Sequence, residues 1–305
     1  MIFAFGNPVY DEITTPRVST DGRVLSGCST NFALALSRLG EQVTLVGTIG
    51  RDYRMAFERD LRKAGIAACV TEAPETGGFR LNYYDDRGNR TLDVLGRASA
   101  IETFPAGVQD ARAVLVGPIL GETGFDLIRR LRKATRGVFM LDPQGLLRRE
   151  TGGAIEHVKT EGIEEVVGLF DIVKPNELEC RVLTGIDPRV DAETPARMIH
   201  SWGPQIVVIT LAEEGSVVFD GRTFTRVPAY PADCVDATGA GDTYAAGFMY
   251  ARLRGLPPET CALWGTATAS IMIEHVGPDF PMTRESVQGR VNQLAAAKGA
   301  TVSRI

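Results

Sequence analysis

The feature that most constrains the fold is a regular alternation of short apolar segments with longer amphipathic ones. The short segments are apolar throughout and rich in β-branched residues, which is typical of strands buried on both faces. Between them, apolar residues recur at helical spacing, and these stretches end near glycines, as helices often do. The pattern predicts βαβ units, and therefore an α/β fold with a doubly wound, mostly parallel sheet flanked by helices. The predicted strands are residues 2–6, 43–47, 114–116, 138–141, 172–174 and 206–210.

Two segments interrupt this rhythm, namely residues 11–25 and 79–94. The first is polar and rich in turn residues, and the second alternates around residues 85–89, which have the composition of a hairpin turn. We expect both to form small antiparallel strands outside the main sheet, as a β lid over one edge. The alternative is an irregular surface excursion. The last third of the chain predicts helices over 240–254, 258–274 and 283–297, and residues 1–305 form a single expected domain.

Composition excludes several classes of function. The 305 residues include 33 Lys and Arg against 38 Asp and Glu, a net charge of −5 that argues against nucleic-acid binding, which needs clustered positive charge. The five cysteines and three histidines are scattered without metal-site spacing, so we expect free thiols and no Cys/His metal centre. The first residues predict a strand instead of a signal peptide, and apolar runs are too short to span a bilayer. We therefore expect a cytoplasmic protein without membrane contact.

The strongest chemical signal is D-A-T-G-A-G-D at Asp236–Asp242, which opens a long predicted helix. Gly239, Ala240 and Gly241 let the backbone approach a ligand closely, and a helix N-terminus favours an anion. A carboxylate at an anion site is unfavourable unless Asp242 accepts a proton from a hydroxyl that attacks a phosphate. The alternative is ordinary helix capping after a glycine turn. The chain contains no G-x-x-x-x-G-K-[ST] phosphate loop.

A second signal, K-P-N-E-L-E, follows a predicted strand. Asn176 and Glu179 share one face of a first helical turn, and their oxygens suit Mg²⁺ bound through water. The same spacing is also that of a capping box.

Three weaker signals lie at other predicted strand or helix ends. Gly27 and Asn31 belong to a G-C-S-T-N segment before a predicted helix, for which ordinary capping is the alternative. Asp11 follows the first strand and is a candidate for binding substrate hydroxyls, or an ordinary turn residue. Gln144 follows a strand at the sheet edge where α/β proteins bind ligands. Residues 210–216 join two strands, either as a plain hairpin or as a loop that lines a nucleotide.

Together these segments resemble the PfkB/ribokinase family of small-molecule kinases, in the family's order and over nearly the whole chain. The resemblance implies that Asp242 is the general base and that Gly239, Ala240 and Gly241 form the anion hole. Asp11, Gly27, Asn31 and Gln144 would bind the acceptor. The remaining implied roles are Asn176 and Glu179 for Mg²⁺ through water, Thr210, Gly215 and Thr238 for ATP, and Asp236 with Thr238 for a monovalent cation such as K⁺.

The implied activity is ATP-dependent transfer of the γ-phosphoryl group to an alcohol of a small polyol or sugar. Residues 97–101, 142–148 and 278–280 resemble the archaeal myo-inositol kinase branch, which makes a cyclic polyol the leading acceptor. Cys28 stands where ribokinases have lysine, which argues against ribose. The alternatives are a nucleoside or simple sugar kinase, a non-catalytic nucleotide-binding or ligand-binding protein, and a hydroxymethylpyrimidine or pyridoxal-type kinase. The family's lid also implies a homodimer joined through it.

Overall fold

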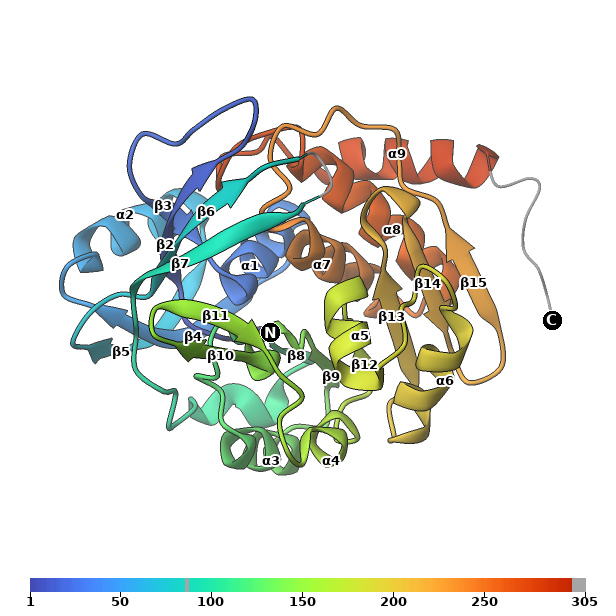
Figure 1. Ribbon diagram of the computed structural model, residues 1–305, viewed down its shortest axis with the longest axis horizontal. Coiled ribbons are helices and arrows are strands. Elements are labelled where there is room, and N and C mark those ends of the chain that lie inside the picture. Colours follow the sequence, from blue (N-terminus) through green and yellow to red (C-terminus); the bar gives the residue numbers. More distant parts are fainter. Residues whose placement is uncertain (86–87, 298–305) are drawn as a thin grey trace.

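The computed structural model describes residues 1–85 and 88–297, and its centre is a nine-stranded sheet (Figure 1). The strand order is β15-β14-β13-β12-β9-β8-β1-β4-β5. The β13–β14 and β14–β15 ladders are antiparallel, and the remaining ladders are parallel. The strands are β1 (Ile2–Phe5), β4 (Val43–Gly50), β5 (Ala67–Ala73), β8 (Ala113–Val116), β9 (Val138–Leu141), β12 (Ile172–Val173), β13 (Ile206–Thr210), β14 (Ser216–Phe219) and β15 (Phe224–Val227).

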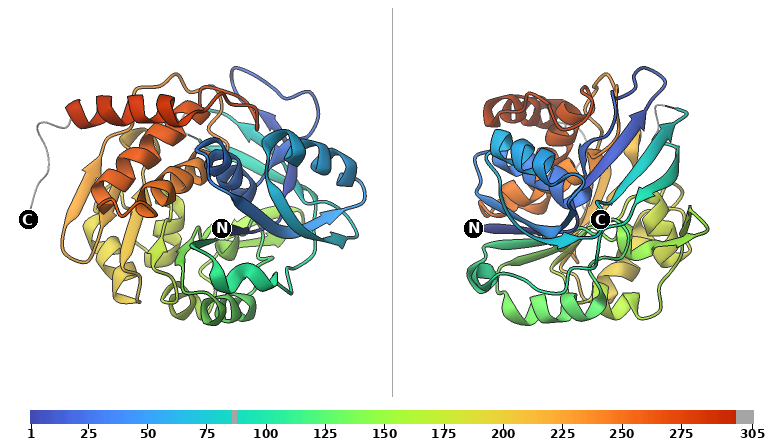
Figure 2. Two further views of the ribbon diagram at one scale, coloured as in Figure 1. Left: turned by 180° about the vertical axis from the view of Figure 1, so that it is seen from behind. Right: turned by 90° about the vertical axis from the view of Figure 1, so that its left-hand side faces the viewer.

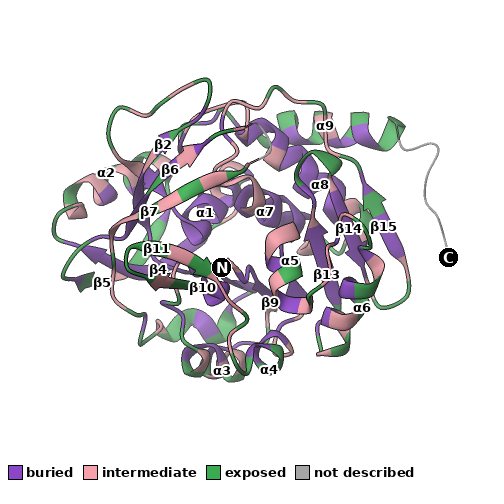
Figure 3. Ribbon diagram, viewed as in Figure 1, coloured by how far each residue is buried: buried purple, intermediate pink, exposed green. Residues whose placement is uncertain are grey.

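Helices cover both faces of this sheet, which confirms the doubly wound α/β architecture (Figure 2). One apolar cluster packs one face of the sheet against α1, α2, α7, α8 and α9, and the other packs the opposite face against α3 to α6. Apart from the edge strand β5, which is mostly exposed, the sheet between them is almost wholly buried (Figure 3). The helices are α1 (Cys28–Arg38), α2 (Arg54–Ala64), α3 (Phe125–Ala134), α4 (Ile163–Val167), α5 (Glu177–Thr184), α6 (Glu193–Ser201), α7 (Ala240–Arg252), α8 (Pro258–Met272) and α9 (Arg284–Ala297).

A second, six-stranded sheet lies over the carboxyl ends of the central strands, in the order β10-β11-β7-β6-β2-β3 (Figures 1 and 2). Both interrupting segments contribute strands to it. The expectation of purely antiparallel strands was wrong at one ladder, because β2 and β6 pair in parallel. Residues 86–87 of the expected hairpin turn lie outside the described residues. The strands are β2 (Val9–Thr14), β3 (Val24–Ser26), β6 (Gly78–Tyr83), β7 (Arg90–Gly96), β10 (Arg148–Thr151) and β11 (Ala154–His157).

The sequence interpretation missed the hairpin β10–β11, which pairs with β7 through Ala154 and Asp93. Its sequence, R-R-E-T-G-G-A-I-E-H, is short and charged, and its strands are too brief to show a hydrophobic period. Hence its place in the small sheet is set by pairing with a strand distant in sequence.

The helices of the last third pack most tightly where α7 crosses α8. Gly247 lies at this crossing, and a Cβ built on it would be 2.5 Å from the carbonyl oxygen of Trp264 and would overlap the hydroxyl of Thr268. The close approach of the two helices therefore requires the missing side chain.

We expect Gly247→Ala to lower the free energy of unfolding by about 1–3 kcal/mol, because the methyl group overpacks a tight interface. The matched control is Gly289→Ala in α9, where a Cβ would meet nothing within 4 Å. That substitution is expected to be neutral or to stabilise by up to about 1 kcal/mol through helix propensity. Urea unfolding of both variants tests the packing, and equal effects at the two positions would contradict it.

Candidate active site

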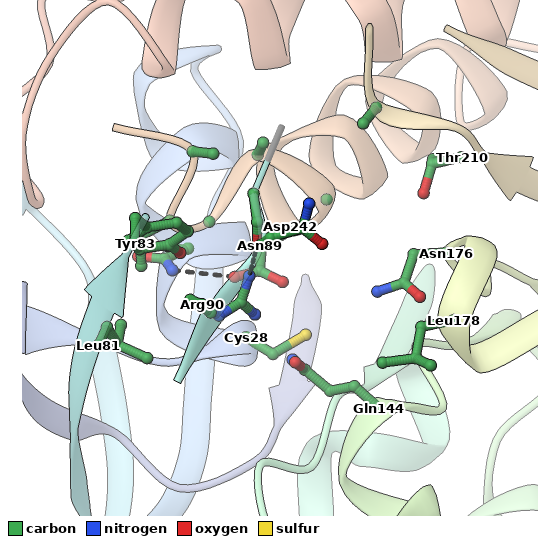
Figure 4. Close-up of a pocket in the computed structure, with 18 of the residues that line it drawn as sticks. Cys28, Leu81, Tyr83, Asn89, Arg90, Gln144, Asn176, Leu178, Thr210 and Asp242 are labelled. Carbon is green, nitrogen blue, oxygen red and sulfur yellow. Dashed lines mark hydrogen bonds between the residues drawn. The ribbon is translucent and has the colours of Figure 1, made fainter. Parts of the chain in front are cut away.

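A cavity of about 1440 Å³ lies between the carboxyl ends of the central strands and the small sheet. This is the edge at which open α/β sheets bind their ligands. A pocket for one small ligand usually measures about 300–1000 Å³, so this cavity has room for two reactants. The predicted site residues Asp11, Gly27, Asn31, Gln144, Asn176, Glu179, Thr210, Gly215, Thr238, Gly239, Ala240, Gly241 and Asp242 all line it, and Figure 4 shows several of them around one space.

The first turn of α7 forms one wall of the cavity. Gly239 is the N-cap in the left-handed region, with φ of 82°, and a Cβ there would lie 2.7 Å from Asn31 Nδ2. A Cβ on Gly241 would lie 3.1 Å from the ammonium nitrogen of Lys174. Both glycines therefore make room for groups on the wall. The Ala240 N–H donates to the Ala237 carbonyl at 3.2 Å, and the N–H groups of Gly241 and Asp242 have no intrahelical acceptors. The wall has the backbone character of an anion hole.

Asp242 projects into the cavity from the same turn and is 9% exposed. One carboxylate oxygen accepts a hydrogen bond of 2.9 Å from Asn31 Nδ2, donated from the start of α1. Burial and the nearby Asp142 carboxylate raise the pKa of Asp242 above its ordinary value, against the opposing effects of Asn31 and Lys174. A carboxylate with a raised pKa is a better proton acceptor, so the geometry and the charge environment both suit a general base.

Lys174 and Asp142 form a buried ion pair of 2.9 Å next to Asp242, with side chains 2% and 4% exposed. The sequence interpretation placed Lys174 in a motif but gave it no role, although a lysine at the end of an apolar strand was a usable signal. Cys28 Sγ and carboxylate oxygens of Asp142 and Asp242 lie within 4.8 Å of one another. Burial raises the pKa of the Cys28 thiol well above its usual range, so this thiol stays protonated.

Asn176 and Glu179 form the capping box that was the structural alternative for this pair. The Glu179 N–H donates to Asn176 Oδ1 at 2.9 Å, and the Asn176 N–H donates to Glu179 Oε2 at 2.9 Å. Glu179 is nevertheless buried at the cavity wall, and burial together with Asp142 raises the pKa of its carboxyl. A carboxylate accepts several hydrogen bonds, so capping leaves oxygen lone pairs for a hydrated cation.

Asp11 lies within β2, not in a turn, and its side chain is 3% exposed. The Phe79 N–H donates to its carboxylate at 2.7 Å, which ties β2 to β6 beside the cavity. Burial raises the pKa of Asp11 to about 6. Asp11 therefore presents a carboxyl group to the cavity beside the small sheet.

The same part of the cavity also contains two arginines: Arg148, which the sequence interpretation named only within the segment 142–148, and Arg90, which it missed. Arg148, at the start of β10, donates hydrogen bonds to Gln144 Oε1 at 2.9 Å and to the Ile119 carbonyl at 3.2 Å. Arg90, at the start of β7, donates to the Gly88 carbonyl at 3.1 Å. The Nε atoms of both arginines are buried and have no hydrogen-bond partner among the described residues. The two arginines place hydrogen-bond donors on the same wall as the Asp11 carboxylate, which accepts hydrogen bonds.

The opposite end of the cavity is lined by Thr210 and Gly215 (Figure 4 labels Thr210), whereas Thr238 lines it next to Tyr83 of the small sheet. The connection between β13 and β14 is a hairpin, as one interpretation of residues 210–216 expected, and it lines the cavity; its contact with a nucleotide stays a prediction. Thr238 Oγ1 donates to the Tyr83 hydroxyl at 2.8 Å, which links this loop to the small sheet. Asp236 lies buried behind the wall and accepts the Thr238 N–H at 2.8 Å.

The family comparison agrees with this arrangement: the family described as pfkB family carbohydrate kinase matches residues 5–285. The chain belongs to the PfkB family. Its members are small-molecule kinases, and a ribokinase from Arabidopsis thaliana with the same fold was solved with ribose and ATP. The protein is accordingly a small-molecule kinase with the ribokinase-like fold. Among the residues that the structure describes, none of the helices is long and apolar enough to cross a membrane.

Similar proteins within the family act on different acceptors. A cytidine kinase from Thermococcus kodakarensis is 32% identical over 273 residues, which cover 88% of this chain and 92% of the relative. A nucleoside kinase from Methanothermobacter thermautotrophicus is 28% identical over 292 residues, or 91% of this chain and 89% of the relative. A pyrophosphate-dependent kinase of the ribokinase family, solved with a pyrophosphate analog and myo-inositol, has a TM-score of 0.80 at 24% identity, covering 95% of this chain and 100% of that one.

Because the pKa of Asp11 is raised, we expect its ionisation in the folded state to lower the free energy of unfolding. Because the folded state holds the proton more tightly than the unfolded chain, stability falls as the pH rises from about 4 to about 6. The difference between 3.8 and about 6 corresponds to about 3 kcal/mol. We expect Asp11→Asn to be more stable than the wild type by up to this amount at pH 7.5, and by much less at pH 4.

Urea unfolding at the two pH values measures this difference, with the exposed Asp110→Asn as the control. Asparagine keeps an oxygen to accept the Phe79 N–H, so the variant isolates the charge. A stability difference that is the same at both pH values would show that Asp11 ionises normally.

Proposed function

We propose that the protein transfers the γ-phosphoryl group of ATP to a hydroxyl of a small polyol or sugar, with a myo-inositol-like cyclic polyol as the leading acceptor. The observation that carries this proposal is the position of Asp242. A buried carboxyl of raised pKa projects from the start of α7 into a cavity with room for two reactants. A carboxylate beside an anion hole is costly for a protein that only binds phosphate, which argues against a non-catalytic binding protein.

In the proposed reaction, Asp242 accepts the proton of the attacking hydroxyl as its oxygen bonds to the γ-phosphorus. The bond between that phosphorus and the oxygen bridging to the β-phosphate breaks, and ADP leaves. The N–H groups around Gly239, Ala240 and Gly241 stabilise the charge of the transferred group. Such transfer depends mainly on positioning and charge neutralisation, with a modest base.

The residues proposed to bind the cofactors lie in or behind the same cavity wall. Asn176 and Glu179 would hold Mg²⁺ through water, and a buried carboxyl of raised pKa fits a divalent cation that restores its charge. Bound Mg²⁺ would neutralise phosphate oxygens of the donor. Thr210, Gly215 and Thr238 would line ATP. Asp236 and Thr238 are our candidates for a K⁺ contact.

The acceptor would be held by both hydrogen-bond acceptors and donors. Asp11 offers a carboxyl group, Gly27 leaves room for backbone contact, and Asn31 and Gln144 offer amides, with Arg148 alongside. This mixture suits a ligand with several neighbouring hydroxyls. A nucleoside is the second candidate, because the cytidine kinase relative is 32% identical over most of this chain. The small sheet over the cavity weighs against a hydroxymethylpyrimidine or pyridoxal-type kinase.

A cytoplasmic location and a homodimer joined through the small sheet stay predictions.

The test is ADP release with Mg-ATP against a panel of inositols, simple sugars and nucleosides. We expect turnover with at least one polyol or sugar, and Asp242→Asn should lower kcat with that acceptor by at least about a thousandfold. ATP binding, measured by calorimetry, should change little, because the amide keeps the shape of the carboxylate.

Asp126→Asn is the matched control, since that carboxylate lies on the surface of α3 and is 85% exposed. It should keep wild-type kcat. Full activity of Asp242→Asn would overturn the assignment of the base. Turnover restricted to nucleosides would replace the leading acceptor with the second candidate.

A further inference from the structure

We infer that Lys174 is a further catalytic residue, whose ammonium group contacts the phosphoryl group during transfer, and that Asp142 positions it. This inference rests on the proposed function. It concerns a pair that the described mechanism does not use, and it starts from the place of the pair in the fold.

Lys174 directly follows β12, and Asp142 directly follows the neighbouring strand β9. Because these parallel strands end at the same edge, both side chains enter the cavity at the level of the α7 N-terminus. The ammonium nitrogen lies 2.9 Å from Asp142 Oδ2 and 3.1 Å from the Cβ position of Gly241. A cation therefore stands directly against the anion hole.

The charges around this ammonium group explain why the site needs it. Three carboxyl groups are buried near it, those of Asp142, Glu179 and Asp242. Each of them interacts electrostatically with Lys174. A transferred phosphoryl group brings further negative charge to the same place. Without Lys174, the incoming group would meet carboxylates beside the backbone N–H groups, and the site would repel its own substrate.

Stability does not account for the pair. Replacing a buried ion pair with apolar residues of similar size is often neutral or stabilising, because desolvation of both charges is costly. A pair that served stability alone could lie within the core, but Lys174 and Asp142 line the cavity. The Lys174 ammonium is paired with the Asp142 carboxylate at 2.9 Å, so it stands at the cavity wall as a positioned charge.

In the transfer step, Lys174 neither gives nor takes a proton. The acceptor proton goes to Asp242, the new bond joins the acceptor oxygen to the γ-phosphorus, and ADP leaves with the bridging oxygen. The ammonium group pairs with non-bridging oxygens of the phosphoryl group throughout. Asp142 holds it in place, so the charge is oriented before the reaction starts.

The first test compares Lys174→Met with the wild type, using Mg-ATP and the acceptor that turns over fastest. Methionine keeps most of the length of the side chain and removes the charge. We expect kcat to fall by about 100- to 1000-fold, while the KM values for ATP and acceptor stay within about threefold. Lys133→Met, at an exposed position on α3, is the matched control and should keep wild-type kcat.

A second variant guards against misfolding, since Lys174→Met leaves Asp142 buried without its partner. The double variant Asp142→Asn with Lys174→Met removes both charges, so it should recover the melting temperature but not kcat. Chemical rescue separates catalysis from structure: added ethylammonium should restore turnover to Lys174→Ala with saturation, as a purely structural lysine would not allow.

The inference is overturned if Lys174→Met keeps kcat within threefold of the wild type, or if the double variant regains wild-type kcat. It is also overturned if ethylammonium restores nothing to a folded Lys174→Ala. These outcomes leave the proposed function intact as long as the wild type turns over an acceptor and Asp242→Asn does not. Absence of wild-type turnover on every acceptor would instead reject the proposed function itself.

Discussion

The burial of Asp242 at the start of α7 is the constraint on which the rest of the structure depends. A carboxylate at a helix N-terminus is itself favoured by the helix dipole, but here it shares that place with the proposed binding surface for the phosphoryl group. Three groups make this tolerable, namely the Asn31 amide, the Lys174 ammonium and those N–H groups at the start of α7 that lack an intrahelical acceptor. Each of them comes from a different element, so the site exists only in the complete fold.

The parallel sheet delivers these groups to one edge. Strands β9, β12 and β13 are neighbours in the sheet, and their carboxyl ends carry Asp142, Lys174 and Thr210. Helix packing then brings α1 and α7 side by side, so Asn31 reaches Asp242 across 211 residues of sequence. The small sheet covers this edge and contributes the buried Asp11 to the lining of the cavity.

The features that could be predicted from the sequence were the local ones. Buried strands, helices and the glycine-rich start of α7 each leave their pattern within a few residues, so the doubly wound fold was predicted from them. The capping box of Asn176 and Glu179 was likewise visible in its spacing. Its suitability for Mg²⁺ depends on burial beside Asp142, which no local pattern contains.

The missed features depend on contacts between distant segments. The hairpin β10–β11 pairs with β7, and Arg148, the first residue of β10, lines the cavity. Lys174 was noticed only as part of a motif, because its partner Asp142 lies on another strand. Charged residues that follow neighbouring strands are hard to assign until the strand order is known.

The central claim is direct transfer, in which the acceptor oxygen attacks the γ-phosphorus while Asp242 takes only a proton. The most direct measurement is the stereochemical course of the reaction, using ATP made chiral at the γ-phosphorus with oxygen isotopes. A single in-line displacement predicts inversion of configuration in the phosphorylated product. Retention would mean two displacements through a phosphorylated side chain, and it would contradict the role assigned to Asp242.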